Sequence, residues 1–254
     1  METLLLKLVL TPLLIGLVSL AGRRWGPAVS GWLVGLPLTS GPVALFLALD
    51  QGTAFAARAA VGILAGAIAQ VAFCLAYSRL AFRLSWQLTV PLSCGMYFAV
   101  VAALVEVTPP LLPLYVAVIA LLAVTVALMP RRKPAATVVS RPAPWWDVPG
   151  RMLVATSFVV TLTELAPVLG PHLSGLLAPF PIYATVLGAF THRSEGAAAA
   201  ARLLRGVMLG LFSFATFFAV VAALVTRAGI AAAFVSAAVA AVALQGLSLR
   251  AARG

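Results

Sequence analysis

Few side chains in this sequence could take part in chemistry, and the most informative is a glutamate inside an apolar stretch. Glu164 stands in VVTLTELAPVLGP, flanked by Thr161 and Thr163. If this stretch crosses a membrane, a buried carboxylate costs about 2.5–3.5 kcal/mol and must be paired, protonated or exposed to water. The pattern favours a proton- or cation-coupling group, and Glu164→Gln should then abolish coupled uptake. The alternative is an interfacial glutamate, since five residues separate Glu164 from the end of the expected helix.

Two further stretches combine polar groups with helix-breaking residues inside apolar sequence. They read GLPLTSGP at 35–42 and APFPIYA at 178–184. Proline removes a backbone donor, so the freed backbone groups must find partners or line a wet cavity. A half-helix beginning near Ser40 would direct its positive end into such a cavity and favour anionic groups. The residues expected to bind a solute are Pro37, Thr39, Ser40, Gly41, Pro42, Phe180, Pro181 and Tyr183.

Sequence signatures of enzymes and metal sites are not found. The chain has no HExxH, GxSxG, Walker A or GxGxxG motif. Cys74 and Cys94 both lie in apolar sequence, where small core residues are expected, and His172 and His192 are far apart. We therefore expect no catalytic residue, no metal and no cofactor.

The composition excludes a soluble domain. Of 254 residues, 63% are hydrophobic and only 9% are charged, and the mean hydropathy is +1.11. Soluble domains carry roughly 25% charged residues. The net charge of +11 does not indicate nucleic-acid binding, because basic residues of membrane proteins collect in cytoplasmic loops. The partner is the lipid bilayer, and the chain is expected to be an all-α polytopic membrane protein.

Hydropathy predicts nine transmembrane helices of about twenty residues each. The expected spans are 3–22, 29–49, 58–78, 88–105, 111–129, 151–169, 173–191, 203–225 and 230–248. With the N-terminus outside and the C-terminus inside, 14 of the 17 Lys and Arg residues fall in cytoplasmic segments. Basic residues mark the cytoplasmic side, so this distribution supports both the orientation and the number of spans.

An internal duplication organises the chain. When the sequence is shifted by 144 residues, 26–66 aligns with 170–210 without gaps, and 14 of 41 pairs are identical. The identical pairs include Gly26/Gly170, Pro37/Pro181, Gly52/Gly196, Arg58/Arg202 and Gly62/Gly206. Such self-similarity is the signature of a structural repeat.

The duplication predicts three regions: a first four-helix repeat at 1–106, a connecting helix and Pro/Arg-rich cytoplasmic linker at 107–150, and a second repeat at 151–254. Five crossings separate equivalent helices, so the second repeat is inverted in this 4+1+4 arrangement. If spans two and seven were instead re-entrant, the repeats would be parallel. Interrupted helices at matching places in the two repeats mark the solute site of inverted-repeat transporters.

The layout resembles that of small inverted-repeat secondary transporters, of which drug/metabolite carriers are a size-matched example. GLPLTSGP and FTHRSEGAAAAARLLRG also look like segments of bacterial inner-membrane proteins, and the Ala/Arg/Gly-rich composition is typical of GC-rich bacterial genomes. The resemblance implies a multi-pass protein of the inner membrane that transports a small solute by alternating access, but it implies no known substrate; only the helix beginning near Ser40 favours an anionic one. Two alternatives stay open: a channel, and a membrane-embedded enzyme or lipid-handling protein.

Small-residue faces in two helices would allow unusually close helix packing. GILAG at 62–66 and GVMLG at 206–210 have glycines four residues apart, which lets backbones approach. The sequence leaves two uses open for these faces, a homodimer interface and packing within the chain.

Overall fold

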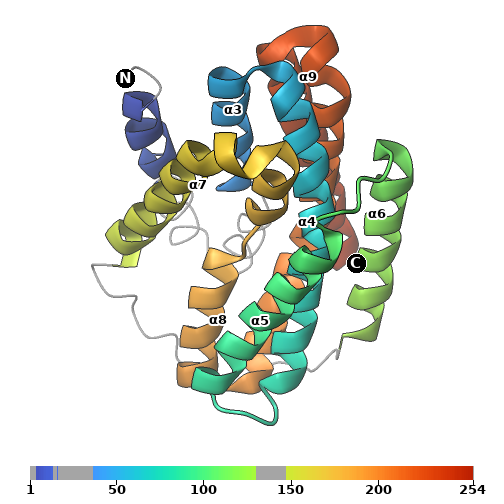
Figure 1. Cartoon of the computed structure of the whole chain (residues 1–254). Coiled ribbons are helices and arrows are strands. Elements are labelled where there is room, and N and C mark those ends of the chain that lie inside the picture. Colours follow the sequence, from blue (N-terminus) through green and yellow to red (C-terminus); the bar gives the residue numbers. More distant parts are fainter. Residues whose placement is uncertain (1–3, 14–15, 17–36, 130–146, 254) are drawn as a thin grey trace.

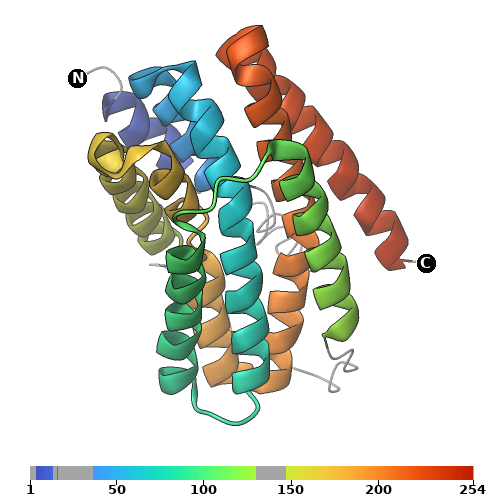
Figure 2. The ribbon, with the colours of Figure 1, turned by 45° about the vertical axis from the view of Figure 1, so that its right-hand side comes forward.

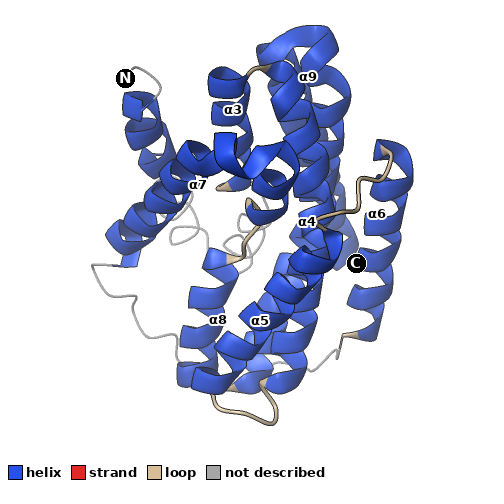
Figure 3. Ribbon diagram, viewed as in Figure 1, coloured by secondary structure: helices blue, strands red, loops and turns tan. Residues whose placement is uncertain are grey.

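The computed structural model describes residues 4–13, 16, 37–129 and 147–253 of the chain. These residues form a bundle of helices, and no strand occurs among them (Figure 3). In chain order the elements are the N-terminal helix Leu4–Leu13, α3 Ser40–Gln51, α4 Thr53–Leu80, α5 Trp86–Leu104, α6 Leu111–Leu128, α7 Asp147–Leu177, α8 Ile182–Glu195 and α9 Ala197–Arg253.

Five elements of the described chain are long and apolar enough to cross a membrane, which supports the predicted membrane class. They lie at Thr53–Leu80, Trp86–Leu104, Leu111–Leu128, Val148–Leu177 and Ala197–Gly246. The second and seventh expected spans differ from these five, because each contains a shorter helix. The second contains α3, with 12 residues, and the seventh contains α8, with 14. At a rise of about 1.5 Å per residue, neither helix alone crosses a hydrocarbon core of about 30 Å.

Several predicted segments lie outside the described residues. These are the second half of the first expected span apart from residue 16, the beginning of the second, and the Pro/Arg-rich linker between α6 and α7. For the first aligned pairs of the duplication, such as Gly26/Gly170, the structure therefore describes only the residue in the second repeat.

Two of the long elements are interrupted by a glycine with a positive φ. Gly170 in α7 has φ 74° and ψ 168°, and Gly229 in α9 has φ 80° and ψ 172°. Such angles are not helical and are accessible almost only to glycine. Figure 2 shows that the chain reverses its direction within α9, so the segments 197–228 and 230–253 lie beside each other as two helices. The two segments correspond to the helices expected at 203–225 and 230–248, and that each crosses the membrane separately stays a prediction.

The helix α4 forms the centre of the bundle and packs against α3, α5, α6, α7 and α9 (Figures 1 and 2). Its close packing depends on glycine. A Cβ atom at Gly62 would lie 2.6 Å from the carbonyl oxygen of His172, and one at Gly66 would lie 2.5 Å from Cγ of Pro179. A Cβ at Gly175 would lie 2.3 Å from the carbonyl oxygen of Ala59. The GILAG face therefore packs within the chain, against the end of α7, while homodimerisation stays a prediction.

Candidate functional site

The two proline-containing breaks, 144 residues apart, meet at one place in the bundle. The first is the turn Pro37–Thr39 before α3, and the second is the connection 178–181 between α7 and α8. The hydroxyl of Ser40 donates a hydrogen bond of 2.9 Å from the first break to the carbonyl of Ala178 in the second. A cavity of about 40 Å³ lies between them. Its described lining consists of residues 37–40, 179–184, Gln70 of α4, and Val207, Leu211 and Phe214 of α9.

Local chemistry accounts for both breaks. Pro179 and Pro181 have no backbone N–H, and proline disfavours helical geometry in the residue before it, so α7 ends at Leu177. Short hydrogen bonds then turn the chain: the N–H of Ile182 donates to Phe180 over 2.8 Å. Before α3, the N–H of Gly41 donates to the carbonyl of Pro37 over 2.7 Å, a helical bond that joins Pro37 to the first turn of α3. These turns leave two new helix beginnings beside the cavity.

The helices that begin at the cavity leave it in opposite directions. In Figure 1, α3 runs from the middle of the bundle to the upper end, and α8 runs from the middle to the lower end. Neither helix has a side-chain cap, since Thr39 and Pro181 make no such hydrogen bond. Helix N-termini carry partial positive charge from uncapped N–H groups. Two of them directed at one cavity favour a solute with negative charge.

Gln70 supplies a further polar group from the central helix. Its Oε1 atom is buried, and no hydrogen-bond partner for it occurs among the described residues. A buried polar atom without a partner costs about 1–3 kcal/mol, so its position beside a cavity points to a group that binds something there. The side-chain amide has one acceptor and two donors, so it can bind solute groups of either kind.

Six of the eight residues expected to bind a solute line this cavity. They are Pro37, Thr39, Ser40, Phe180, Pro181 and Tyr183. Gly41 and Pro42 do not line it, because they lie buried in the first turn of α3. Phe180 also stacks on Phe98 of α5, with ring centroids 5.4 Å apart and planes at 20°. The break between α7 and α8 is thus supported by aromatic packing from α5.

Eight lining residues were not among those predicted. Four lie within the two breaks, namely Leu38, Pro179, Ile182 and Ala184. The other four come from other helices, namely Gln70, Val207, Leu211 and Phe214. The last three are apolar residues of an apolar helix and carry no signal of their own. Gln70 did carry one, because it is an isolated amide in the small-residue helix α4. The same shift of 144 residues relates Gln70 to Phe214, so equivalent positions of the two halves face one cavity.

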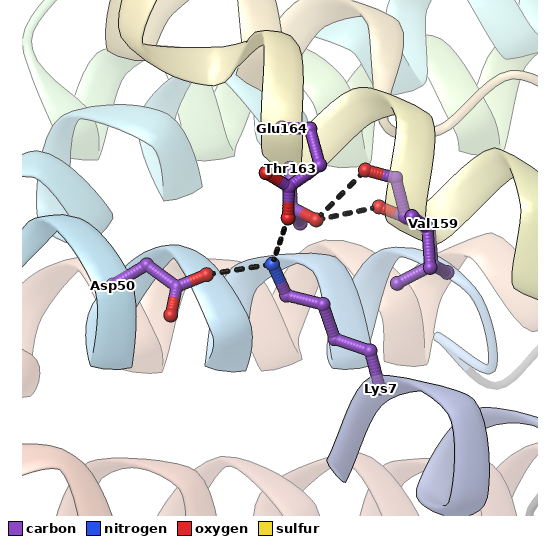
Figure 4. A network of polar contacts seen from close by, with 6 residues as sticks. Lys7, Asp50, Val159, Thr163 and Glu164 are labelled. Atoms are coloured by element: carbon purple, nitrogen blue, oxygen red, sulfur yellow. Dashed lines mark hydrogen bonds and ion pairs between the residues drawn. The ribbon is translucent and has the colours of Figure 1, made fainter. Parts of the chain in front are cut away.

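Glu164 does not line the cavity and instead belongs to a network of charges near the end of α3 (Figure 4). Nζ of Lys7 lies 2.7 Å from Oδ2 of Asp50 and 3.0 Å from Oε1 of Glu164. The side chain of Lys7 is only 2% exposed, whereas those of Asp50 and Glu164 are 18% and 60% exposed. Asp50 lies in the last turn of α3, at an exposed helix end, and its carboxylate pairs with a buried lysine.

The two threonines beside Glu164 do not join it in a common site. The hydroxyl of Thr163 donates to carbonyls of its own helix, at 2.8 Å to Val159 and 3.1 Å to Val160. Thr161 is exposed. Glu164 lies level with the last turn of α3, beyond the half-helix that begins at the cavity. This placement favours the interfacial alternative for Glu164.

Comparisons with known proteins identify no relative from which a function could be inferred, so the geometry of the site is the only basis for a functional proposal. No protein-family model, no curated protein and no solved structure matches this chain.

Proposed function

We propose that this chain is a secondary transporter of a small solute and that the cavity between the two broken helices is its binding site. The observation that carries the proposal is the meeting of Pro37–Ser40 and Pro179–Ala184 at one cavity. In transporters built from inverted repeats, discontinuous helices at corresponding positions bind the solute near the middle of the membrane.

The backbone supports an inverted repeat of four helices on each side of α6. Gly52 and Gly196 are 144 residues apart, and each separates a short helix from a long one. Their φ angles are both 85°, and their ψ angles are 170° and 175°. Because α3 and α8 leave the cavity in opposite directions, the two halves are related as inverted copies would be (Figure 1). We propose nine crossings on this basis, with α3 plus the residues before it as the second and α8 plus the end of α7 as the seventh.

The orientation follows from the distribution of basic residues. The N-terminus is outside and the C-terminus inside, so the upper end of Figure 1 is the outer end. On composition, the membrane is the inner membrane of a bacterium. In this orientation α3 connects the cavity to the outer surface and α8 connects it to the cytoplasmic surface.

The cavity limits the solute that this conformation can hold. At about 40 Å³ it has room for only a few water molecules, since one water needs about 10–15 Å³ of such space. Two helix N-termini and the polar groups of Thr39, Ser40 and Gln70 surround it. We propose a small anionic solute, with the described conformation occluded and a larger cavity in the open states.

The test is thiol accessibility from each side of the membrane. Cys74 and Cys94 are replaced by alanine, and a single cysteine is placed at Ser40 or Ala184, which both line the cavity. Sealed vesicles with protein of one orientation are treated with a membrane-impermeant thiol reagent from either side. Labelling of one position from both sides is expected for alternating access. Labelling from one side only would favour a re-entrant or enzyme-like cavity.

A matched control position separates cavity access from general exposure. Ala44 lies one turn after Ser40 in α3, is fully buried and does not line the cavity. Ala44→Cys should stay unlabelled from both sides. If Ser40→Cys and Ala184→Cys behave like Ala44→Cys, the paired breaks are structural kinks and the transporter proposal fails.

A further inference from the structure

We infer that Glu164 and Lys7 form a latch that closes the cavity on the outer side, with Asp50 as the anchor that holds Lys7 to α3. This inference rests on the proposed transport function and adds the residues that control access to its site. It assigns Glu164 to gating, not to the coupling role expected from the sequence.

The half-helix α3 is held at both of its ends. At the cavity, Ser40 binds the carbonyl of Ala178 over 2.9 Å. At the outer end, Asp50 in the last turn binds Lys7 over 2.7 Å. Lys7 comes from the N-terminal helix and also binds Glu164 of α7, so three elements meet at one ammonium group (Figure 4). Separation of α3 from α7 at the outer side requires these contacts to break.

The contacts differ in how easily they break. Lys7 is nearly fully buried, and its ammonium lies 5.8 Å from the ring centroid of Phe46, one turn before Asp50 on α3. The Asp50 carboxylate is closer and less exposed than that of Glu164. An ion pair with an exposed partner contributes little because water competes for it, whereas a buried charge cannot lose its main partner without a large cost. Lys7 therefore stays with α3, and the Glu164 contact is the one that opens.

The cytoplasmic end of α8 lacks a matching latch among the described side chains. Ser194 occupies the position equivalent to Asp50, is exposed, and donates only to the carbonyl of Phe190 in its own helix. Nearby, Nδ1 of His192 is buried and has no partner among the described residues. Among the described side chains, an ion-pair network therefore occurs at the outer end of α3 and not at the cytoplasmic end of α8, where Arg193 lies 5.9 Å from the ring centroid of Trp86 instead.

The experiment measures how fast a thiol in the cavity is labelled from the outside. The reporter is Ala184→Cys in the background without Cys74 and Cys94, in vesicles of one orientation. Glu164→Gln should raise the outside labelling rate by up to about fivefold, the change in open population that corresponds to about 1 kcal/mol. Arg58→Gln is the matched control, because it removes an exposed charge near the start of α4, at the same end, and should leave the rate unchanged.

A second variant keeps the latch testable if Glu164→Gln does not fold. Lys7→Met combined with Asp50→Leu replaces the buried ammonium and its main partner by apolar side chains, and such paired replacement is often neutral for stability. It should also raise outside labelling, whereas Lys7→Arg, which keeps the charge, should not. The latch is overturned if Glu164→Gln and the double variant are both labelled from the outside only as fast as the unmodified protein, while labelling from the inside is preserved. That result would leave the transporter proposal standing. If Ala184→Cys reacts from neither side in any variant, the transporter proposal itself fails.

Discussion

Gly52 and Gly196 adopt nearly the same backbone conformation although they lie 144 residues apart. Both have φ 85°, with ψ 170° at Gly52 and 175° at Gly196. Each glycine ends a short helix that begins at the cavity and starts a long helix of the central bundle. The two halves therefore use the same residue and the same angles to join a half-helix to its neighbour.

The two glycines should be intolerant of alanine for a purely backbone reason. Their angles fall in a region used almost only by glycine, and a Cβ atom there costs about 1–3 kcal/mol. No atom lies within 4 Å of a Cβ built at either position, so steric contact does not contribute. Thermal unfolding in detergent should show Gly52→Ala and Gly196→Ala to be destabilised by similar amounts.

Gly206 provides the control for this comparison. It is helical, and a Cβ at that position also meets nothing within 4 Å among the described residues. Gly206→Ala should therefore stabilise the protein by about 0.5–1 kcal/mol. An unfolding temperature of Gly52→Ala equal to that of Gly206→Ala would contradict the backbone explanation.

Close contact between α4 and the end of α7 should make Gly175→Ala and Gly62→Ala destabilising through overpacking. The added Cβ atoms would lie 2.3 Å and 2.6 Å from backbone carbonyl oxygens, which cannot rotate away as a side chain can. Overpacking of this kind costs about 1–3 kcal/mol, and more where backbone must move. Unfolding in detergent measures the loss. Stability retained in both variants would show that α4 and α7 are not packed this closely.

The two carboxylates around Lys7 should contribute unequally to stability. Asp50→Asn removes the closer and less exposed partner of a buried ammonium, and hydrogen bonds to charged groups are worth about 1.5–3 kcal/mol. Glu164→Gln removes a largely exposed partner and should cost about 1 kcal/mol or less. A double-mutant cycle with Lys7→Met, followed by thermal unfolding, gives both coupling energies. A larger coupling for Glu164 than for Asp50 would reverse their assignment as latch and anchor.

Gln70 should show opposite effects on stability and on binding. Gln70→Leu replaces a buried acceptor that has no partner among the described residues, so the free energy of unfolding should rise by about 1 kcal/mol. The same change removes a polar group from the cavity. Thermal shifts with a panel of small anions such as acetate, phosphate and sulfate should therefore be weaker than in the unmodified protein.

A conservative control distinguishes these two effects. Gln70→Asn keeps the amide but shortens it, so it should retain some anion-dependent shift. If Gln70→Leu binds the same anions with undiminished shifts, Gln70 is not part of the solute site.

The membrane class and the positions of the breaks follow from local properties of the sequence. Apolar stretches of helical length predicted α4, α5 and α6 to within a few residues, because a span needs only continuous hydrophobic sequence. Pro37 and Pro181 predicted where α3 and α8 begin, since proline lacks the backbone N–H that would continue a preceding helix and is well tolerated at a helix start. The matched glycines and prolines at a spacing of 144 residues also indicated that the two breaks are related.

The partners of each group were decided by tertiary structure alone. Lys7 and Glu164 are 157 residues apart, and nothing local shows that one ammonium joins Glu164 to Asp50. Gln70 became part of the site only because α4 is central to the bundle and passes beside both breaks. Local backbone chemistry determines where a helix begins and ends, whereas the pairing of a buried charge depends on which helices become neighbours. For this reason the sequence located the breaks, and the packing of the helices determined what they face.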